Sequence, residues 1–329
     1  MNRAGKKIGL VLMALLLLFG AGCTSGPAEA TESDAYIASV DLGIEDIEEE
    51  AVALAKAPAI PNSTMPKASG SLVKKSEKAE IDYSNTADGY VMARYAAATS
   101  KKLKAQVKGP SGTAYTYNLT AGADYATFPL SDGNGSYKVT VFENISGTSY
   151  ATVVSVTFTA ALKDEFAPFL LPNQYVNYTP DSQVVKKAAE LTGSENDPLK
   201  KVQTIYNYVV KNITYDDQKA ASVQSGYLPV LDTVLSEKKG ICFDYAAVMA
   251  AMLRSQNVPT KLVVGYSGSI YHAWINVYSK ETGWVEGVVY FDGTSWKLMD
   301  PTFASSGKQS KKIMEYIGND ANYSAKYIY

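Results

Sequence analysis

The sequence contains very little histidine and cysteine. Its 329 residues include one histidine, His272, and two cysteines, Cys23 and Cys242. Zinc sites in proteins are built mainly from cysteine and histidine ligands, so this scarcity excludes a structural zinc site. A thiol enzyme needs a base beside its cysteine, and only His272 could supply that base here. We therefore expect no bound metal and no cofactor.

A surplus of charge of one sign is also missing. The chain has 31 Lys and Arg residues against 33 Asp and Glu residues, which gives a net charge of −2. Proteins that bind nucleic-acid phosphates usually carry a surplus of basic residues. The composition therefore gives no support to nucleic acid as a partner.

The apolar run near the N-terminus is too short to cross a membrane as a helix. It covers the 12 residues 8–19, against the ~20 that span a bilayer. Basic residues precede it, and small residues and Cys23 follow it, which resembles a bacterial lipoprotein signal. We expect residues 1–22 to be removed and Cys23 to carry a lipid outside the cytoplasm; an ordinary cleaved signal peptide is the alternative. Lipidation would leave Cys242 without a disulfide partner in the chain, and hence as a thiol.

Composition and periodicity divide the rest of the chain into three parts. Residues 23–80 are rich in Ala, Ser, Pro, Lys and Glu, which predicts a flexible tether. Residues 81–162 alternate apolar and polar positions, which predicts a small antiparallel β-sandwich similar to immunoglobulin-like modules. Residues 165–329 have a helical period, and we expect these last two parts to fold independently. The strands predicted for the sandwich are residues 90–95, 103–107, 115–119, 126–130, 136–142 and 151–158.

The helical part contains clear start and stop signals. Asp197 is placed to cap a helix over residues 198–210, which begins with proline. Another helix begins at Cys242 and ends near Asn257, because asparagine tolerates a left-handed cap. The other expected elements are a helix over residues 181–191 and strands over residues 261–266, 272–278 and 295–299.

The position of Cys242 at a helix start has a chemical consequence. The positive end of a helix favours a thiolate over a thiol, and the first backbone N–H groups can stabilise an oxyanion formed by attack from that sulfur. On the strand 272–278, alternation places His272, Trp274 and Asn276 on one face.

Four segments, in this order, resemble the core of the transglutaminase-like superfamily. They are GICFDYA at residues 240–246, MLRSQNVPT at 252–260, YHAWINVY at 271–278 and LMDPT at 298–302. The resemblance covers roughly residues 170–305. The chain departs from the family pattern at Asn257, where glycine is common, and at Asn276, where glutamate or another polar residue is usual.

This resemblance implies a papain-like α+β fold after the sandwich and a catalytic triad. The triad would consist of Cys242 as nucleophile on the helix, His272 as base on a strand, and Asp300 as the residue that orients the histidine.

Three more residues are candidates for the substrate cleft or the oxyanion site. Tyr215 could donate to the oxyanion or belong to the core. Asp244 could contact substrate or act as a first-turn carboxylate that stabilises its helix. Trp274 could form a wall of the cleft or pack in the core.

Three hypotheses about the function therefore remain. The first is thiol-dependent acyl transfer on glutamine or peptide amides of exported proteins or cell-wall peptides. The second is hydrolysis by a cysteine protease or amidase with the same triad. The third is a surface protein that binds or acts as a scaffold without catalysis, and the intact Cys, His and Asp set argues against it. The sequence does not decide between transfer and hydrolysis, because loops that control access of water and amine determine the outcome.

Overall fold

The computed structural model describes residues 61–62, 64–285, 289–291, 296–298, 302 and 322–329. Cys23, Asp300 and most of the expected tether lie outside these residues. Ala57–Tyr329 forms one compact unit. Within the described part, no helix combines the length and the hydrophobicity needed to cross a membrane.

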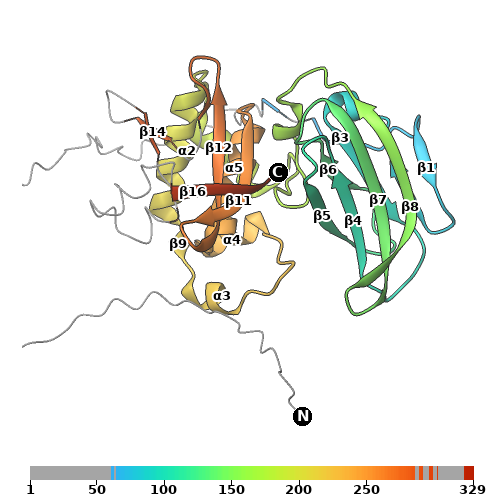
Figure 1. Ribbon diagram of the computed structural model, residues 1–329. Coiled ribbons are helices and arrows are strands. Elements are labelled where there is room, and N and C mark those ends of the chain that lie inside the picture. The colour runs from blue at the N-terminus through green and yellow to red at the C-terminus, as the bar shows by residue number, and fades with distance from the viewer. Residues whose placement is uncertain (1–60, 63, 286–288, 292–295, 299–301, 303–321) are drawn as a thin grey trace, which may run out of the picture. The chain divides into compact units, whose positions relative to one another are not determined.

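The strand-rich part consists of two four-stranded antiparallel sheets (Figure 1). The first has the order β1-β2-β3-β6 and the second the order β5-β4-β7-β8. A 3-10 turn, Thr86–Asp88, lies between β2 and β3. The strands are β1 Val73–Lys75, β2 Ala79–Asp82, β3 Tyr90–Tyr95, β4 Leu103–Lys108, β5 Ala114–Leu119, β6 Ala126–Pro129, β7 Gly135–Ser146 and β8 Ser149–Ala160.

The alternation in sequence explains how these sheets pack. In β4, Leu103, Ala105 and Val107 are buried while the residues between them are more exposed, so one face of the sheet is apolar. The two sheets share side-chain contacts. Tyr117 on β5 and Phe128 on β6 have ring centroids 4.7 Å apart. All six strands predicted from the sequence in this part are confirmed.

The first two strands correct the predicted end of the tether at residue 80. Strands β1 and β2 begin before that residue, and Ala79 and Ile81 of β2 are buried in the core. The sequence of β1, VKK, is short and mostly exposed. Lysine is common on short edge strands, because it discourages pairing with other chains. The lysine-rich composition of β1 is the same as that of a solvated linker, so composition alone did not distinguish the strand from the tether.

The second part is mixed α/β. Its main sheet has the order β13-β12-β11-β16, and two small sheets pair β9 with β10 and β14 with β15. A 3-10 turn, Ala167–Phe169, precedes it. The helices are α1 Gln183–Thr192, α2 Pro198–Asn212, α3 Asp217–Ser222, α4 Leu231–Glu237 and α5 Cys242–Ser255. The strands are β9 Thr214–Tyr215, β10 Lys239–Gly240, β11 Thr260–Ser267, β12 Ile270–Ser279, β13 Gly283–Val285, β14 Val289–Phe291, β15 Trp296–Leu298 and β16 Tyr323–Ile328.

The predicted helix signals are confirmed. The Asp197 side chain accepts a 2.9 Å hydrogen bond from the backbone N–H of Leu199 and so caps α2. Beyond the end of α5, Asn257 has φ 62°, the left-handed conformation expected of it.

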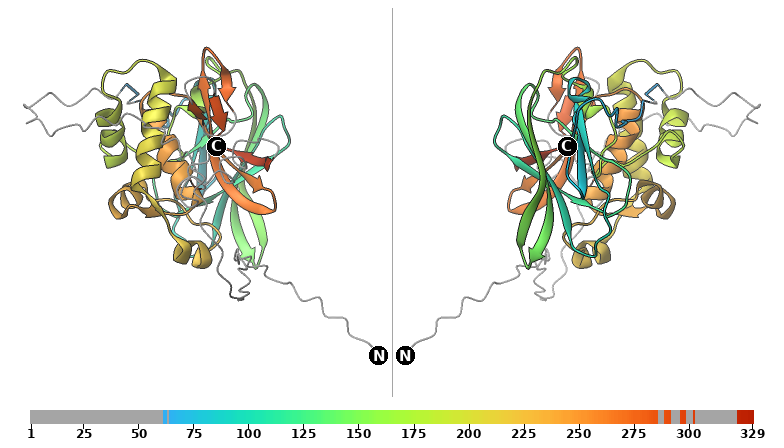
Figure 2. Two further views of the ribbon diagram at one scale, coloured as in Figure 1. Left: turned by 90° about the vertical axis from the view of Figure 1, so that its left-hand side faces the viewer. Right: turned by 90° about the vertical axis from the view of Figure 1, so that its right-hand side faces the viewer.

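Helix α5 is the central element of this part. Every residue from Asp244 to Ser255 is buried. The helix packs against α1, α2 and α4 and against strands β11 and β12 of the sheet. The views in Figure 2 show these helices gathered beside the strands of the sheet. A helix that is surrounded on all sides is apolar around its whole circumference, as the run of Ala, Val, Met and Leu in α5 is.

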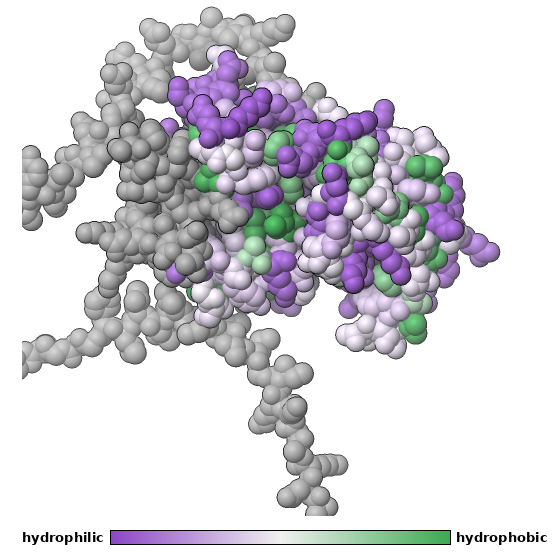
Figure 3. Space-filling model, turned by 45° about the horizontal axis from the view of Figure 1, so that its top comes forward, coloured by the Kyte–Doolittle hydropathy of each residue, from purple (hydrophilic) through white to green (hydrophobic). Residues whose placement is uncertain are grey.

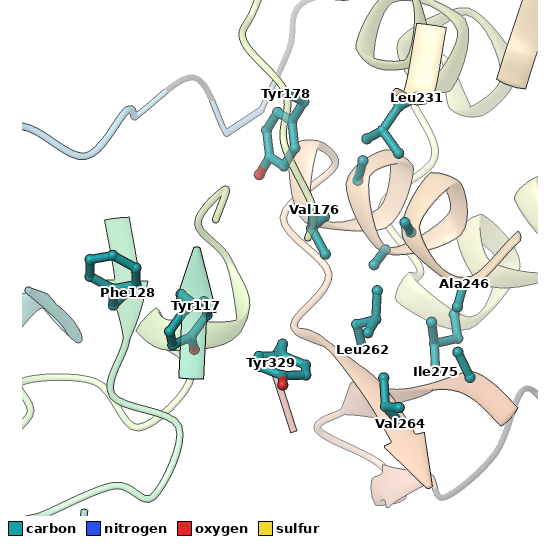
Figure 4. Close-up of a cluster of buried hydrophobic side chains, with 14 of the residues drawn as sticks. Tyr117, Phe128, Val176, Tyr178, Leu231, Ala246, Leu262, Val264, Ile275 and Tyr329 are labelled. Atoms are coloured by element: carbon teal, nitrogen blue, oxygen red, sulfur yellow. The ribbon is translucent and has the colours of Figure 1, made fainter. Parts of the chain in front are cut away.

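The two parts share buried side chains, which the prediction of independent folding did not include. Tyr329 packs its ring against Tyr117 of β5 at 5.8 Å and against Tyr175 at 4.4 Å between ring centroids. Figure 4 shows Tyr329 between Tyr117 on one side and Leu262 on the other. The core is therefore continuous from the strand-rich part to the α/β part.

A side-chain amide adds to this junction at β5, an edge strand of its sheet. Gln174 accepts a hydrogen bond from the backbone N–H of Asn118 at 3.2 Å and donates one to the Asn118 carbonyl oxygen at 2.7 Å. It thereby satisfies both backbone groups of that residue.

Candidate active site

Cys242 is the first residue of α5 and has a half-buried, free thiol. Ile241 precedes it in an extended conformation, and the Ile241 carbonyl accepts the first hydrogen bond of the helix from Tyr245 N at 3.1 Å. Cys242 therefore lies at the positive end of a buried helix.

The short strands β9 and β10 hold the chain that leads into this helix. Tyr215 pairs with Gly240 in parallel register, and Asp216 N donates to the Gly240 carbonyl at 2.9 Å. A Cβ atom on Gly240 would lie 2.7 Å from Cβ of Asp244, so only glycine fits. The structure thus places Tyr215 on the strand next to the start of α5.

His272 lies on β12, opposite Gly265 of β11, and is 4% exposed. Its ring centroid is 6.2 Å from that of Trp274 and 6.4 Å from that of Tyr323. A Cβ atom on Gly265 would lie 2.0 Å from the backbone oxygen of Ser324, so glycine allows β16 to approach here.

Tyr323 is a neighbour of His272 that sequence reasoning missed. It lies on β16, more than twenty positions after the last predicted strand in the chain. The weak two-residue alternation of the sequence YSAKYI was the only signal for this strand. Tyr323 also contacts Trp274, with ring centroids 5.2 Å apart. Trp274 is 5% exposed, so its indole is enclosed between neighbouring rings.

The beginning of α5 lies near the beginning of β12. Partial burial raises the pKa of Tyr271, and the neighbouring Tyr327, Tyr266 and Cys242 raise it further. Helix α5 also packs directly on β12. Cys242 and His272 thus belong to two elements in contact, while Asp300 lies outside the described residues.

The end of the β11–β12 hairpin is unusually apolar at its surface. Tyr266, Ile270 and Tyr271 are 41%, 49% and 56% exposed. On the face that Figure 3 shows, hydrophobic residues form small groups among hydrophilic ones. Aromatic and aliphatic side chains are therefore exposed together at this end of the hairpin.

Asp244, in the first turn of α5, is fully buried. Its Oδ2 atom accepts hydrogen bonds from Ile241 N at 2.8 Å and from Lys219 Nζ at 2.7 Å, and its Oδ1 atom accepts one from the Tyr227 hydroxyl at 2.6 Å. Both carboxylate oxygens are therefore occupied by protein donors. Elsewhere among the described residues, no cluster of three or more His, Cys, Asp or Glu side chains could hold a metal ion.

The family model of the transglutaminase-like superfamily matches residues 185–287, which include Cys242 and His272. The chain therefore contains a transglutaminase-like domain. This match is consistent with the mixed α/β architecture of α1 to β13.

Two curated proteins are similar over part of the chain. The uncharacterized protein YebA of Bacillus subtilis (strain 168) is 29% identical over 128 residues, which cover 32% of this chain and 17% of YebA. The protein-glutamine gamma-glutamyltransferase of Pseudomonas aeruginosa is 25% identical over 109 residues, which cover 29% of this chain and 14% of that enzyme. The chain thus spans less than a fifth of either relative.

Red sea bream transglutaminase is among the solved structures that are similar. The superposition has a TM-score of 0.28 with 14% identity and covers 65% of this chain and 48% of that one. A likeness this low carries no argument about function.

Proposed function

We propose that this protein is an extracytoplasmic, thiol-dependent acyltransferase of the transglutaminase-like type. Its substrates would be glutamine or peptide amides of exported proteins or cell-wall peptides. The observation that carries the proposal is the position of Cys242 at the first residue of a buried helix, α5, that packs on β12, the strand with the only histidine of the chain.

In the proposed reaction, His272 starts as an imidazolium beside the Cys242 thiolate. The thiolate attacks the carbonyl carbon of a glutamine side-chain amide. A sulfur–carbon bond forms, the carbon–nitrogen bond breaks, and the imidazolium gives its proton to the ammonia that leaves. A lysine amine then attacks the thioester, loses a proton to His272 and releases the thiolate. One glutamine amide and one amine thus become one isopeptide bond and one ammonia.

Three other residues support these steps. Asp300 would hold the His272 ring in the orientation and tautomer that the proton transfers require. The first N–H groups of α5, with the Tyr215 hydroxyl as a second donor, would stabilise the oxyanion. Trp274 would form an apolar wall beside the histidine.

Similarity to an enzyme named protein-glutamine gamma-glutamyltransferase favours transfer over hydrolysis, although it covers only part of each chain. The same triad could also give the thioester to water, as in a cysteine protease or amidase. The cleft's access to amine and water decides between the two products.

The N-terminal part would set the location of the enzyme. Cys23 would anchor the chain to a bacterial membrane by its lipid, and residues up to the first sheet would give the catalytic part reach. The two four-stranded sheets support an immunoglobulin-like module between the anchor and the catalytic part.

Incubation with a glutamine-containing peptide and a fluorescent primary amine tests this function. We expect the amine to become attached to the peptide, with release of ammonia, and we expect Cys242→Ala to abolish both. Release of ammonia or of peptide fragments without attachment of the amine would show that the protein is a hydrolase and not a transferase. If the wild type and Cys242→Ala proteins behave alike, the protein is a binding protein or scaffold.

A further inference from the structure

A buried charge network lies directly behind the first turn of α5. Asp244 joins Lys219 at 2.7 Å, Tyr227 at 2.6 Å and the backbone N–H of Ile241 at 2.8 Å. Lys219 Nζ also donates to the Tyr227 hydroxyl at 2.5 Å and lies 4.4 Å above the centre of the Tyr227 ring. Asp244 is fully buried, whereas the Lys219 side chain is 26% exposed.

The protonation states of this network follow from its contacts. Burial by itself lowers the pKa of Lys219, but hydrogen bonds to Asp244 and Tyr227 outweigh it, and the net shift is upward. Burial, followed by Asp244, raises the pKa of Tyr227 to about 12. At neutral pH, Lys219 is therefore a cation and Tyr227 a neutral donor, and both donate hydrogen bonds to the Asp244 side chain.

The network also fixes the segment that supplies the lysine. Asp216 accepts a 3.0 Å hydrogen bond from Lys219 N and caps α3, and it lies 3.6 Å from Lys239 of β10. Helix α3 is thus tied to β10 at one end and to α5 by the lysine side chain. The ammonium group of Lys219 is therefore held in its ion pair with Asp244.

We propose that Lys219 and Asp244 are positioning residues for Cys242: Asp244 holds the backbone N–H of Ile241, and Lys219 cancels the negative charge that Asp244 brings to the first turn of α5, two residues from the thiolate. This inference rests on the proposed role of Cys242 as nucleophile. A buried carboxylate two residues from the sulfur opposes a second negative charge there, unless a cation balances it.

Other titratable groups lie on elements around the start of α5. They are His272 and Tyr271 on β12, Tyr215 on β9, Asp216 and Lys239 around β10, Tyr175 beside Phe243, and Tyr327 on β16. The substitutions below leave all of these in place, so the change in charge is confined to the network.

The test follows the rate of iodoacetamide alkylation of Cys242 in the full-length protein as a function of pH. Mass spectrometry of the tryptic peptide from Gly240 to Arg254 isolates this thiol from Cys23. The variants are Lys219→Met, Asp244→Asn and the double substitution. Lys187→Met removes a lysine from an ion pair with Glu190 on α1 and serves as the matched control.

The proposal predicts shifts of opposite sign. Lys219→Met should move the midpoint of the alkylation profile up by about one pH unit, because Asp244 is then uncompensated. Asp244→Asn should move it down, because Lys219 then acts on the thiolate alone. The double substitution should return it to near the wild-type midpoint, and Lys219→Arg should preserve it.

A merely structural network would give a different result. If both single substitutions shift the profile in the same direction, or neither shifts it more than Lys187→Met does, the proposal is overturned. Thermal unfolding measured on each variant separates loss of fold from change of charge. Because alkylation needs no substrate, this outcome is independent of whether the amine-attachment assay detects transfer.

Discussion

Arg254 in the last turn of α5 donates a 2.7 Å hydrogen bond from Nη2 to the backbone oxygen of Tyr329, 75 positions later in the chain. The guanidinium is fully buried, and it donates further hydrogen bonds to the carbonyl oxygens of Thr260 and Leu171. One side chain thus joins the end of α5, the start of β11, the segment before α1 and the residue that follows β16.

Arg254→Met should therefore cost at least about 3 kcal/mol in the free energy of unfolding, because it leaves several buried carbonyl groups without a donor. Urea denaturation followed by tryptophan fluorescence measures the loss. Arg94→Met is the control, because Arg94 is 38% exposed in its ion pair with Glu80 and should cost no more than about 1 kcal/mol. Equal losses in the two variants would contradict this prediction.

The shared core predicts that residues 165–329 expressed alone are unstable. Without β5, Tyr329 and Tyr175 lose their ring contacts with Tyr117 and become exposed. Each exposed ring should lower the free energy of unfolding by about 2 kcal/mol or more. Soluble yield and the urea midpoint, compared with those of the full chain, give the measurement. A fragment as stable as the full chain would restore the expectation of independent folding.

Acid should weaken the strand-rich part through Glu143. Hydrogen bonds from Lys101 and then from Tyr95 lower the pKa of this carboxyl from 4.5 to about 2. Because the folded value is the lower one, the stabilisation is complete above pH 4.5 and is lost as the pH falls toward 2. Urea midpoints across this range should decline in the wild type and decline less in Glu143→Gln. Glu190→Gln, on the surface of α1, should decline as the wild type does.

Substitutions in the proposed triad should act as a unit. His272→Ala should lower the rate of amine attachment by about a thousandfold or more and slow alkylation of Cys242 strongly. Asp300→Ala should slow alkylation less, because it removes the orienting residue and leaves the base. Asn276→Ala, on the same strand, should retain most activity. Alkylation that is indifferent to His272→Ala would count against the catalytic assignment.

The mature chain should begin at Cys23 with a lipid attached. Intact mass spectrometry of protein extracted from membranes should show an N-terminal mass consistent with diacylglyceryl-cysteine. Cys23→Ser should abolish that mass and release the protein from the membrane fraction. A soluble mature protein cleaved at another position would contradict the prediction.

The sequence predicted those elements whose signals are local. Alternation identified β3 to β8, and the Asp197 cap and Asn257 identified helix ends, because each depends on residues within one turn or strand. The start of α5 at Cys242 was predicted for the same reason. The family resemblance then grouped Cys242 with His272, and both residues lie within residues 185–287, the segment that the family model matches.

Features that depend on distant residues were not predicted. Tyr323 reaches His272 only because β16 returns to pair with β11 beside Gly265. Lys219 and Tyr227 lie in an exposed stretch with no regular period, and only the fold brings them to Asp244. Tyr329 joins the two parts for a similar reason, since nothing near it in sequence indicates the contact.

The Gln174 amide has a consequence for chains held close together. Strand β5 is the outermost strand of its sheet, and an uncovered strand of this kind invites edge-to-edge association with a second molecule. At Asn118 the side-chain amide of Gln174 takes the place of a neighbouring peptide group, so a second molecule's strand cannot extend the sheet there. Molecules crowded on a common surface can then lie side by side without joining their sheets at this position.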